Sequence, residues 1–379
     1  MDDPLIRFRD RFPILEKTTY LVSHSLGAMP KSVRQQLHGY AEAWDLRGVR
    51  AWEEGWWDLP VTVGDVLAPL LGAPRGSVAM LPNVSLAEVV VASCFSFSPP
   101  RNRVVLCDLD FPSVQYVWHG VPGAEVVTVP GRGGLSIETE ELLAAIDERT
   151  AVVAVSHVLF KSAHILDVAA ITARAHQVGA RVVLDCYHSA GILPFSLTGL
   201  KVDFAVGGSV KWLCGGPGGG WLYVRPDLHE VLEPWAVGWQ ADREPFGFRP
   251  GPIEHSEGIW RFLNGTPGVP GLYAARAGYE IVAEAGVEEI RRKSLHMTQW
   301  LIDMAEELEI PVTSELDPGR RAGTVTLGLP DEARLAAALI EARVIVDSRP
   351  GAGVRVGPHF YNSEDDLIKL RKELIRLLG

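Results

Sequence analysis

Short apolar runs separated by segments of helical spacing dominate the middle of this chain. Each run is bounded by Gly, Pro or polar residues, as buried strands usually are. The strand candidates are 78–81, 104–106, 126–129, 152–155, 182–184, 202–206 and 221–224, and the helix candidates include 85–97, 139–147 and 167–178. This alternation predicts an α/β fold with a largely parallel, doubly wound sheet.

The two ends of the chain follow other patterns. In chain order, they predict an irregular arm over 1–30, an amphipathic helix over 31–46, a Pro- and Gly-rich connection over 226–271, a long helix over 272–308 interrupted near Gly286, and a β-α-β-α unit over 310–379. We therefore expect three parts: an N-terminal arm and helix (1–48), a large domain (49–271), and a linking helix with a small C-terminal α/β domain (272–379).

Composition narrows the class of protein. The 379 residues are 47% hydrophobic and 22% charged, with a net charge of −11. This acidic balance argues against nucleic acid or an anionic membrane as the main partner. We expect no membrane span and no signal peptide, because the sequence lacks apolar stretches of the required kind. The four cysteines contain no C-x-x-C pair, which favours reduced thiols in a cytoplasmic protein.

Candidate chemistry is concentrated in residues 181–224. Asp185 ends one apolar run, His188 follows it, and Lys211 follows the next run in a glycine-rich turn. Open α/β sheets bind ligands at the carboxyl ends of their strands. A lysine and a buried carboxylate there suit pyridoxal 5′-phosphate (PLP), whose aldehyde forms a Schiff base with lysine and whose ring nitrogen pairs with a carboxylate. A helix-capping Asp and a salt-bridged Lys would produce the same pattern.

Motifs for other kinds of site are absent. The sequence has no G-x-x-x-x-G-K-[ST] phosphate loop, and no G-x-G-x-x-G follows the first strand, which argues against a dinucleotide site. No His/Cys cluster has zinc-ligand spacing, and the G-x-S-x-G elbow of serine hydrolases is missing. We therefore expect no metal ligands.

Nine short motifs, in matching order along nearly the whole chain, resemble the kynureninases. They are SLGAMP (25–30), RAWEEGWWDLP (50–60), FPS-x-x-Y (111–116), D-x-x-HSAG (185–191), K-W-L-x-GGPG (211–218), GW (238–239), RFLNGTP (261–267), RRKSL (291–295) and VRVGPHFYNS (354–363). Kynureninases are PLP enzymes of the class V branch of the aspartate-aminotransferase fold (fold type I). The resemblance implies a mainly parallel seven-stranded sheet between helices, a smaller α/β C-terminal domain, PLP as cofactor, an amino acid substrate and a homodimer.

The resemblance assigns roles at the ends of the central strands. Lys211 is similar to the Schiff-base lysine, and Asp185 is similar to the partner of the pyridine nitrogen. Phe111 would stack on the cofactor ring, or else be an ordinary core residue. His188 would lie beside the ring, either as a catalytic group or through a structural hydrogen bond. The predicted catalytic residues are Lys211, Asp185 and His188.

The phosphate of the cofactor needs hydrogen-bond donors. Val84 and Ser85 begin a predicted helix, and helix N-termini bind anions. Ser85 is also a suitable N-cap. By resemblance, the other cofactor contacts are Ser209, the indole N–H of Trp239, and Thr266 from the second subunit. Trp239 and Thr266 are therefore expected near a homodimer interface.

Arg355 is the candidate for binding the α-carboxylate of an amino acid substrate. Its guanidinium matches a carboxylate through two parallel hydrogen bonds. It lies in an apolar strand candidate, 354–356, where an internal salt bridge is the alternative role. Trp52 and His24 are further candidates for the substrate-binding wall.

Three positions at the candidate site depart from the family pattern. Kynureninases usually carry a tyrosine before the Schiff-base lysine, whose phenol contacts the phosphate and is implicated in proton transfer; this residue is Val210 here. The aspartate of the family's F-P-[ST]-D is Val114, and the asparagine of its N-S-L-G is His24.

The resemblance implies hydrolytic Cβ–Cγ cleavage of kynurenine or a related β-acyl amino acid. Other class V chemistry remains an alternative: an aminotransferase, a β-eliminating C–S lyase or an epimerase. A non-catalytic PLP-binding protein is the third possibility, motivated by the lost polar residues. A persulfide-forming cysteine desulfurase is disfavoured, because no cysteine follows Cys214.

Overall fold

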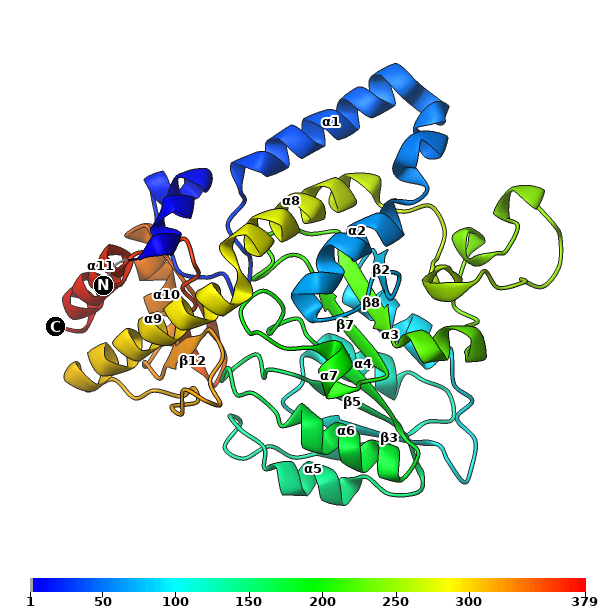
Figure 1. Cartoon of the computed structure of the whole chain (residues 1–379). Coiled ribbons are helices and arrows are strands. Elements are labelled where there is room, and N and C mark those ends of the chain that lie inside the picture. Colours follow the sequence, from blue (N-terminus) through cyan, green and yellow to red (C-terminus); the bar gives the residue numbers. More distant parts are fainter. Residues whose placement is uncertain (1–2) are drawn as a thin grey trace.

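A seven-stranded sheet forms the centre of the computed structural model, which describes residues 3–379 (Figure 1). Its strands lie in the order β2-β8-β7-β6-β5-β3-β4, and only β8 is antiparallel to its neighbours. They are β2 (Val78–Leu81), β3 (Arg103–Cys107), β4 (Glu125–Val129), β5 (Thr150–Ser156), β6 (Arg181–Asp185), β7 (Phe204–Gly208) and β8 (Gly220–Val224). The predicted mainly parallel sheet is confirmed, since every strand candidate between 78 and 224 overlaps one of its strands.

Helices cover both faces of this sheet, because alternate residues of a buried strand point to opposite sides. In β6, Val182 and Leu184 pack in one core and Val183 packs in the other. The helices that contribute to the first core are α2 (Leu59–Leu67), α5 (Thr139–Ala145), α6 (Val168–Gln177), α7 (Leu197–Leu200) and α8 (Val269–Ala285); those of the second are α3 (Val84–Ala92) and α4 (Pro112–His119).

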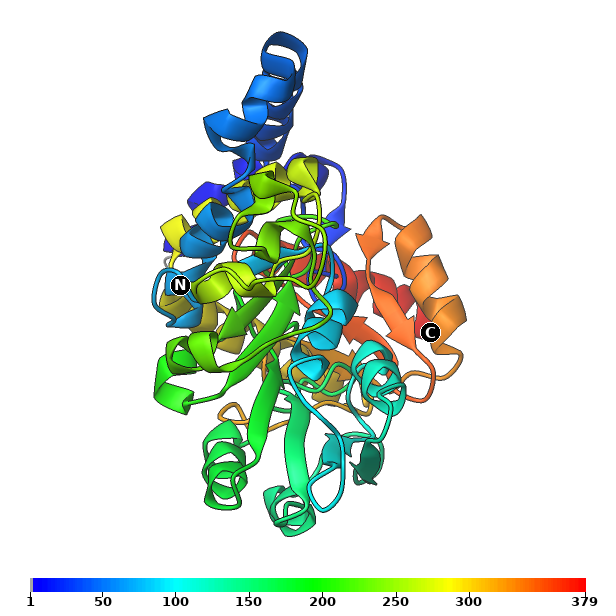
Figure 2. The same cartoon turned by 90° about the vertical axis from the view of Figure 1, so that its right-hand side faces the viewer.

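Helix α1 (Lys31–Arg47) projects from the body of the molecule at the top of Figures 1 and 2. It runs beside α8, and its far end leads into two short turns, η3 (Gly48–Ala51) and the π-helix η4 (Trp52–Trp56). Large apolar side chains are exposed there: Trp44 by 63%, Leu46 by 67% and Val49 by 82%. These side chains form an exposed apolar surface at the end of the helix.

The Pro- and Gly-rich connection contains only short 3-10 turns. They are η6 (Pro226–Val231), η7 (Trp239–Ala241), η8 (Pro245–Gly247) and η9 (Gly258–Phe262); a further turn, η5 (Ala68–Leu71), follows α2. The connection ends at α8, and Gly286, with a φ of +80°, separates α8 from α9 (Val287–Glu307). The helix interruption therefore lies where the sequence predicts it.

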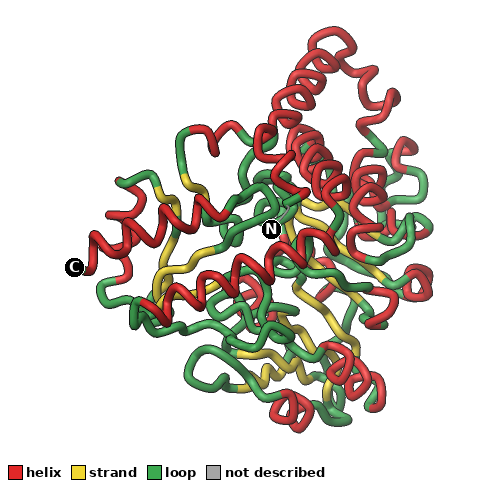
Figure 3. The backbone as a smooth tube through the Cα atoms, turned by 60° about the vertical axis from the view of Figure 1, so that its left-hand side comes forward, coloured by secondary structure: helices red, strands yellow, loops and turns green. Residues whose placement is uncertain are grey.

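The C-terminal residues form a small α/β unit with its own core (Figure 3). Its antiparallel sheet has the order β11-β12-β9, beside helices at the surface. The elements are β9 (Val325–Leu327), α10 (Glu332–Glu341), β10 (Val344–Ile345), β11 (Asp347–Arg349), β12 (Gly353–Val356) and α11 (Glu364–Leu378).

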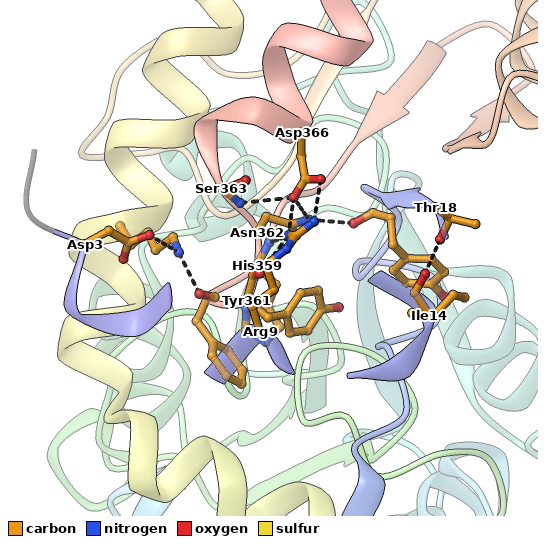
Figure 4. A network of polar contacts seen from close by, with 12 residues as sticks. Asp3, Arg9, Ile14, Thr18, His359, Tyr361, Asn362, Ser363 and Asp366 are labelled. Atoms are coloured by element: carbon orange, nitrogen blue, oxygen red, sulfur yellow. Dashed lines mark hydrogen bonds and ion pairs between the residues drawn. The ribbon is translucent and has the colours of Figure 1, made fainter. Parts of the chain in front are cut away.

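The N-terminal segment is attached to this small unit. It contains two 3-10 helices, η1 (Pro4–Arg11) and η2 (Pro13–Glu16), and a short strand β1 (Thr19–Tyr20) that pairs in parallel with β10. Arg9 donates to both oxygens of Asp366 and to the carbonyl of Tyr361, as Figure 4 shows. Asp366 also accepts from Asn362 and from the backbone of Ser363 at the start of α11. The arm is therefore more regular than its sequence suggests.

Within residues 3–379, no helix has both the length and the apolar character needed to cross a bilayer. In the same residues, no group of three or more His, Cys, Asp or Glu side chains is arranged to hold a metal ion.

Candidate active site

A cavity of about 230 Å³ lies where the carboxyl ends of β5 and β6 meet the start of α3. Adjacent parallel strands present these ends at the same edge of a sheet, where open α/β folds bind ligands. Six residues predicted from the sequence line it together: Val84, Ser85, Phe111, Asp185, His188 and Lys211. The structure therefore gathers one part of the predicted site within a single chain.

Asp185 is the last residue of β6 and is buried. Its Oδ1 accepts a hydrogen bond from the backbone N–H of Tyr187 at 2.8 Å, whereas Oδ2 has no hydrogen-bond partner among residues 3–379. Burial raises the pKa of Asp185 to about 6, although this hydrogen bond and the charge of Lys211 oppose the shift. A carboxylate oxygen without a protein partner is suited to a cationic ligand atom.

Lys211 follows β7 and directs its amine into the same cavity. Its Nζ lies 2.6 Å from Nε2 of His188. Burial lowers the pKa of Lys211 to about 7, although the charge of Asp185 opposes the shift. Burial, followed by the charge of Lys211, lowers the pKa of His188 well below its usual value. A neutral His188 therefore accepts a hydrogen bond from an amine that loses its own proton near neutral pH.

Two aromatic rings flank this amine. The Nζ of Lys211 lies 5.4 Å from the ring centroid of Phe111 and 4.4 Å from that of Tyr187. Phe111 is 38% exposed and makes an edge-to-face contact with Phe160, so it is not an ordinary core residue. Tyr187 is absent from the sequence-based assignment, although it lies between two residues that belong to it.

The N-terminus of α3 forms another wall of the cavity. The side chain of Asn83 accepts from the backbone N–H of Leu86 at 3.0 Å, so Asn83 and not Ser85 is the N-cap. Val84 and Ser85 occupy the first turn, where backbone N–H groups have no partner within the helix. Such a helix start favours an anion. The Ser209 hydroxyl, by contrast, is engaged elsewhere: it donates to the carbonyl of Gly219 and contacts the hydroxyl of Tyr279.

Arg355 is held in an internal ion pair. Its Nε and Nη2 donate to the two oxygens of Asp347 at 2.8 and 2.6 Å, and its Nη1 donates to the carbonyl of Phe160 at 2.7 Å. His24 lies 3.0 Å from the same carboxylate. Burial would raise the pKa of Asp347, but the hydrogen bonds from His24 and Arg355 outweigh it and keep this pKa below its usual range. The salt bridge expected as the alternative role of Arg355 is present.

Three predicted residues lie away from this cavity in the single chain. Trp52 and Thr266 line a separate hollow of about 400 Å³, which lies between the C-terminal part of α1, the turns η3 and η4, and the start of α8. The indole N–H of Trp239 donates to the carbonyl of Pro245 at 2.5 Å, and its ring packs on that of Trp57. Within one chain, none of the three lines the cavity that contains Lys211, and neither do the predicted site residues His24, Ser209 and Arg355.

Two further buried carboxyl groups lie behind Asp185. Glu88 on α3 accepts from the indole of Trp118 at 2.8 Å, while its other oxygen is buried and has no hydrogen-bond partner among residues 3–379. Burial, followed by the charge of Asp185, raises the pKa of Glu88 to about 8. Asp110 accepts from two backbone N–H groups, yet burial raises its pKa to about 7. Sequence reasoning missed both, because a single acidic residue in a helical pattern, such as Glu88, or in a turn, such as Asp110, usually indicates a solvated position.

Comparisons with known proteins agree with this geometry. A family model described as aminotransferase class V matches residues 68–370. The kynureninase of Geobacillus thermodenitrificans (strain NG80-2) is 30% identical over 399 aligned residues, covering 99% of this chain and 92% of that protein. The kynureninase of Pseudomonas fluorescens is 32% identical, covering 94% of this chain and 88% of that protein.

Solved structures share the fold at lower identity. The cysteine desulfurase of Thermococcus onnurineus NA1, in its apo form, has a TM-score of 0.86 at 21% identity and covers 100% of this chain and 98% of its own. The cystine C–S lyase C-DES, in complex with its product cysteine persulfide, has a TM-score of 0.86 at 21% identity, with 96% and 98% covered. At this identity the likeness shows the fold alone.

Fold and family together define a PLP-dependent enzyme of fold type I, as the sequence predicts. The chain belongs to the class V aminotransferase family, in its kynureninase-like branch. The cavity residues fit this cofactor: Asp185 has a free oxygen, Lys211 has an amine that deprotonates near pH 7, and α3 offers unpaired N–H groups at its start.

The raised pKa of Glu88 predicts a pH-dependent stability. Between its ordinary pKa near 4.5 and about 8, the folded state keeps a proton that the unfolded state has lost. The free energy of unfolding should therefore fall as pH rises through this window, by up to about 1.4 kcal/mol per pH unit from this one group. Glu88→Gln cannot ionise, so urea unfolding should show a smaller loss of stability between pH 5 and pH 8 than in the unsubstituted protein. Glu42→Gln, at an exposed helix position, is the control, and parallel pH profiles for Glu88→Gln and the unsubstituted protein would refute the assignment.

Proposed function

We propose that this enzyme hydrolyses the Cβ–Cγ bond of kynurenine or a related β-acyl amino acid. The observation that carries the proposal is the 30–32% identity to kynureninases along nearly the whole chain, combined with the cavity that joins Asp185, His188 and Lys211. When bound, PLP withdraws electrons from the substrate Cα and so makes its proton acidic. The remaining tasks belong to the side chains around it.

Lys211 is the proposed attachment point of the cofactor and the group that moves the Cα proton. An amine whose pKa is about 7 is both a competent nucleophile and a base near neutral pH. His188, held neutral and 2.6 Å away, accepts the amine's hydrogen bond and so orients it. Asp185 is the proposed partner of the pyridine nitrogen, and Phe111 is the proposed stacking residue above the ring.

The phosphate is assigned to the start of α3, at Val84 and Ser85. Ser209 is placed at the same end of the cofactor by resemblance, although its hydroxyl is already engaged by Gly219 and Tyr279. Arg355 is proposed to bind the substrate carboxylate, which would replace Asp347 as the partner of its guanidinium. His24, which contacts the same Asp347, is proposed to line the substrate-binding wall beside it.

A second copy of the chain is proposed to complete the site. An apolar hollow of about 910 Å³ runs along the arm and α1, and exposed Leu26, Met29 and Leu37 line it. Such a surface is unusual on a monomer. A homodimer across this hollow would bring Thr266, Trp239 and Trp52 of one chain toward the cavity of the other chain. Within one chain, none of these residues lines the cavity. If analytical ultracentrifugation gives the mass of a monomer, this assembly is contradicted. We propose that the enzyme is cytoplasmic.

Other class V reactions are a second candidate, which the apolar substitutions favour. Val114 is buried in the cavity wall where the family carries a carboxylate. A β-eliminating C–S lyase, an aminotransferase or an epimerase needs no such group. A cysteine desulfurase is not favoured, because no cysteine of the described chain lines this cavity and burial raises the thiol pKa of Cys186 and Cys214.

The proposed reaction is tested by incubating the purified holoenzyme with kynurenine and with 3-hydroxykynurenine. Formation of anthranilate or 3-hydroxyanthranilate together with alanine is expected, since hydrolysis splits the β-acyl group from the amino acid. Neither product from either substrate would reject the proposal. Release of pyruvate, or transfer of the amine to an α-keto acid, would then identify the second candidate.

Arg355→Lys separates substrate binding from internal pairing. Lysine keeps the charge but loses the planar fork that matches a carboxylate, so the Michaelis constant should rise about tenfold or more, at about 1.4 kcal/mol per tenfold. The control is Arg321→Lys, another buried arginine of the small unit, which hydrogen-bonds only to residues outside the cavity. If Arg355→Lys lowers the melting temperature as Arg321→Lys does but leaves the Michaelis constant unchanged, Arg355 is purely structural.

A further inference from the structure

Tyr187 is a cavity residue that the proposed roles leave unused. It lies on the loop after β6 and lines the same cavity as Asp185 and Lys211. Its backbone N–H donates to Asp185, but within residues 3–379 its hydroxyl has no hydrogen-bond partner. Tyr187 is partly buried, and a phenol hydroxyl that has no protein partner in a ligand cavity is available to donate to a ligand.

Two paired glycines show where this hydroxyl lies relative to α3. A Cβ atom on Gly208, at the end of β7, would overlap the hydroxyl and Cζ of Tyr187, so the ring tip lies directly against this strand end. Gly208 pairs with Gly220 of β8, and a Cβ atom on Gly220 would lie 2.6 Å from Cα of Asn83. Asn83 is the N-cap of α3. The hydroxyl therefore lies in the corner between the end of β7 and the start of α3.

The hydroxyl is a donor at working pH. Burial, followed by the charge of Asp185, raises the pKa of Tyr187 to about 12. A phenol that keeps its proton can donate to an anion but cannot act as a base near neutral pH. The nine-residue helix α3 begins in the same corner with unpaired N–H groups, so two kinds of donor converge there. Val210, immediately before Lys211, contributes no donor.

We propose that the Tyr187 hydroxyl donates a hydrogen bond to the phosphate group of the cofactor. Tyr187 would thus supply the phenol that Val210, immediately before Lys211, cannot provide. The proposal rests on the assignment of the phosphate to the start of α3. Gly208 is part of the same arrangement, because any larger residue there would displace the Tyr187 ring.

The test compares ligands with and without the phosphate on proteins with and without the Tyr187 hydroxyl. Dissociation constants for PLP and for pyridoxal, which lacks the phosphate, are measured on the apoprotein and on Tyr187→Phe. Tyr223→Phe is the control, since it removes the hydroxyl of another tyrosine, which is buried in β8 and lies outside the cavity. We expect Tyr187→Phe to weaken PLP binding at least tenfold and pyridoxal binding less than twofold, with both unchanged in Tyr223→Phe.

Equal weakening of both ligands in Tyr187→Phe, or no weakening of either, would overturn the proposal. The melting temperature of each apoprotein variant is also measured. If Tyr187→Phe lowers the melting temperature and weakens the binding of PLP and pyridoxal equally, the role of Tyr187 is structural and the proposal is overturned. Because the readout is binding, absence of kynurenine cleavage would reject the proposed reaction without affecting this result.

Discussion

The candidate active site depends on one buried amine, that of Lys211. Burial makes a charged ammonium unfavourable, and this moves the pKa of Lys211 to about 7. The nearby carboxylate of Asp185 limits the shift, and neutral His188 accepts the amine's hydrogen bond. The sheet order creates this balance, because β6 and β7 are adjacent and parallel. The lowered pKa of this lysine is therefore a consequence of the position where two neighbouring strands end.

A single carboxylate connects the pieces of the chain that surround this amine. Asp347 on β11 binds Arg355 of the neighbouring strand and His24 of the N-terminal segment, and Arg355 also donates to the carbonyl of Phe160 in the large unit. Removing one partner from a buried pair leaves an uncompensated charge, which costs about 3–5 kcal/mol. The same contacts that fix the small unit thus hold Arg355, so a substrate carboxylate bound in the way we propose would compete with Asp347 for it.

The central sheet and the meeting of Asp185 with Lys211 were predictable from one continuous stretch of sequence. Apolar runs mark buried parallel strands, and the carboxyl ends of such strands share one edge. Glu88 and Tyr187 were not predictable, because their importance arises from what packs around them rather than from their spacing. Trp52 could be named only by resemblance, since it lines a separate hollow within one chain and no spacing in the sequence connects it with Lys211.

The most direct test of this account is to locate the covalent cofactor link. The holoenzyme is reduced with borohydride, digested, and mapped by mass spectrometry for the pyridoxyl-phosphate label. The account predicts one labelled peptide, with the modification on Lys211, and no label after Lys211→Ala. Labelling of another lysine, such as Lys161 beside Phe160, would contradict the assignment on which the site is built.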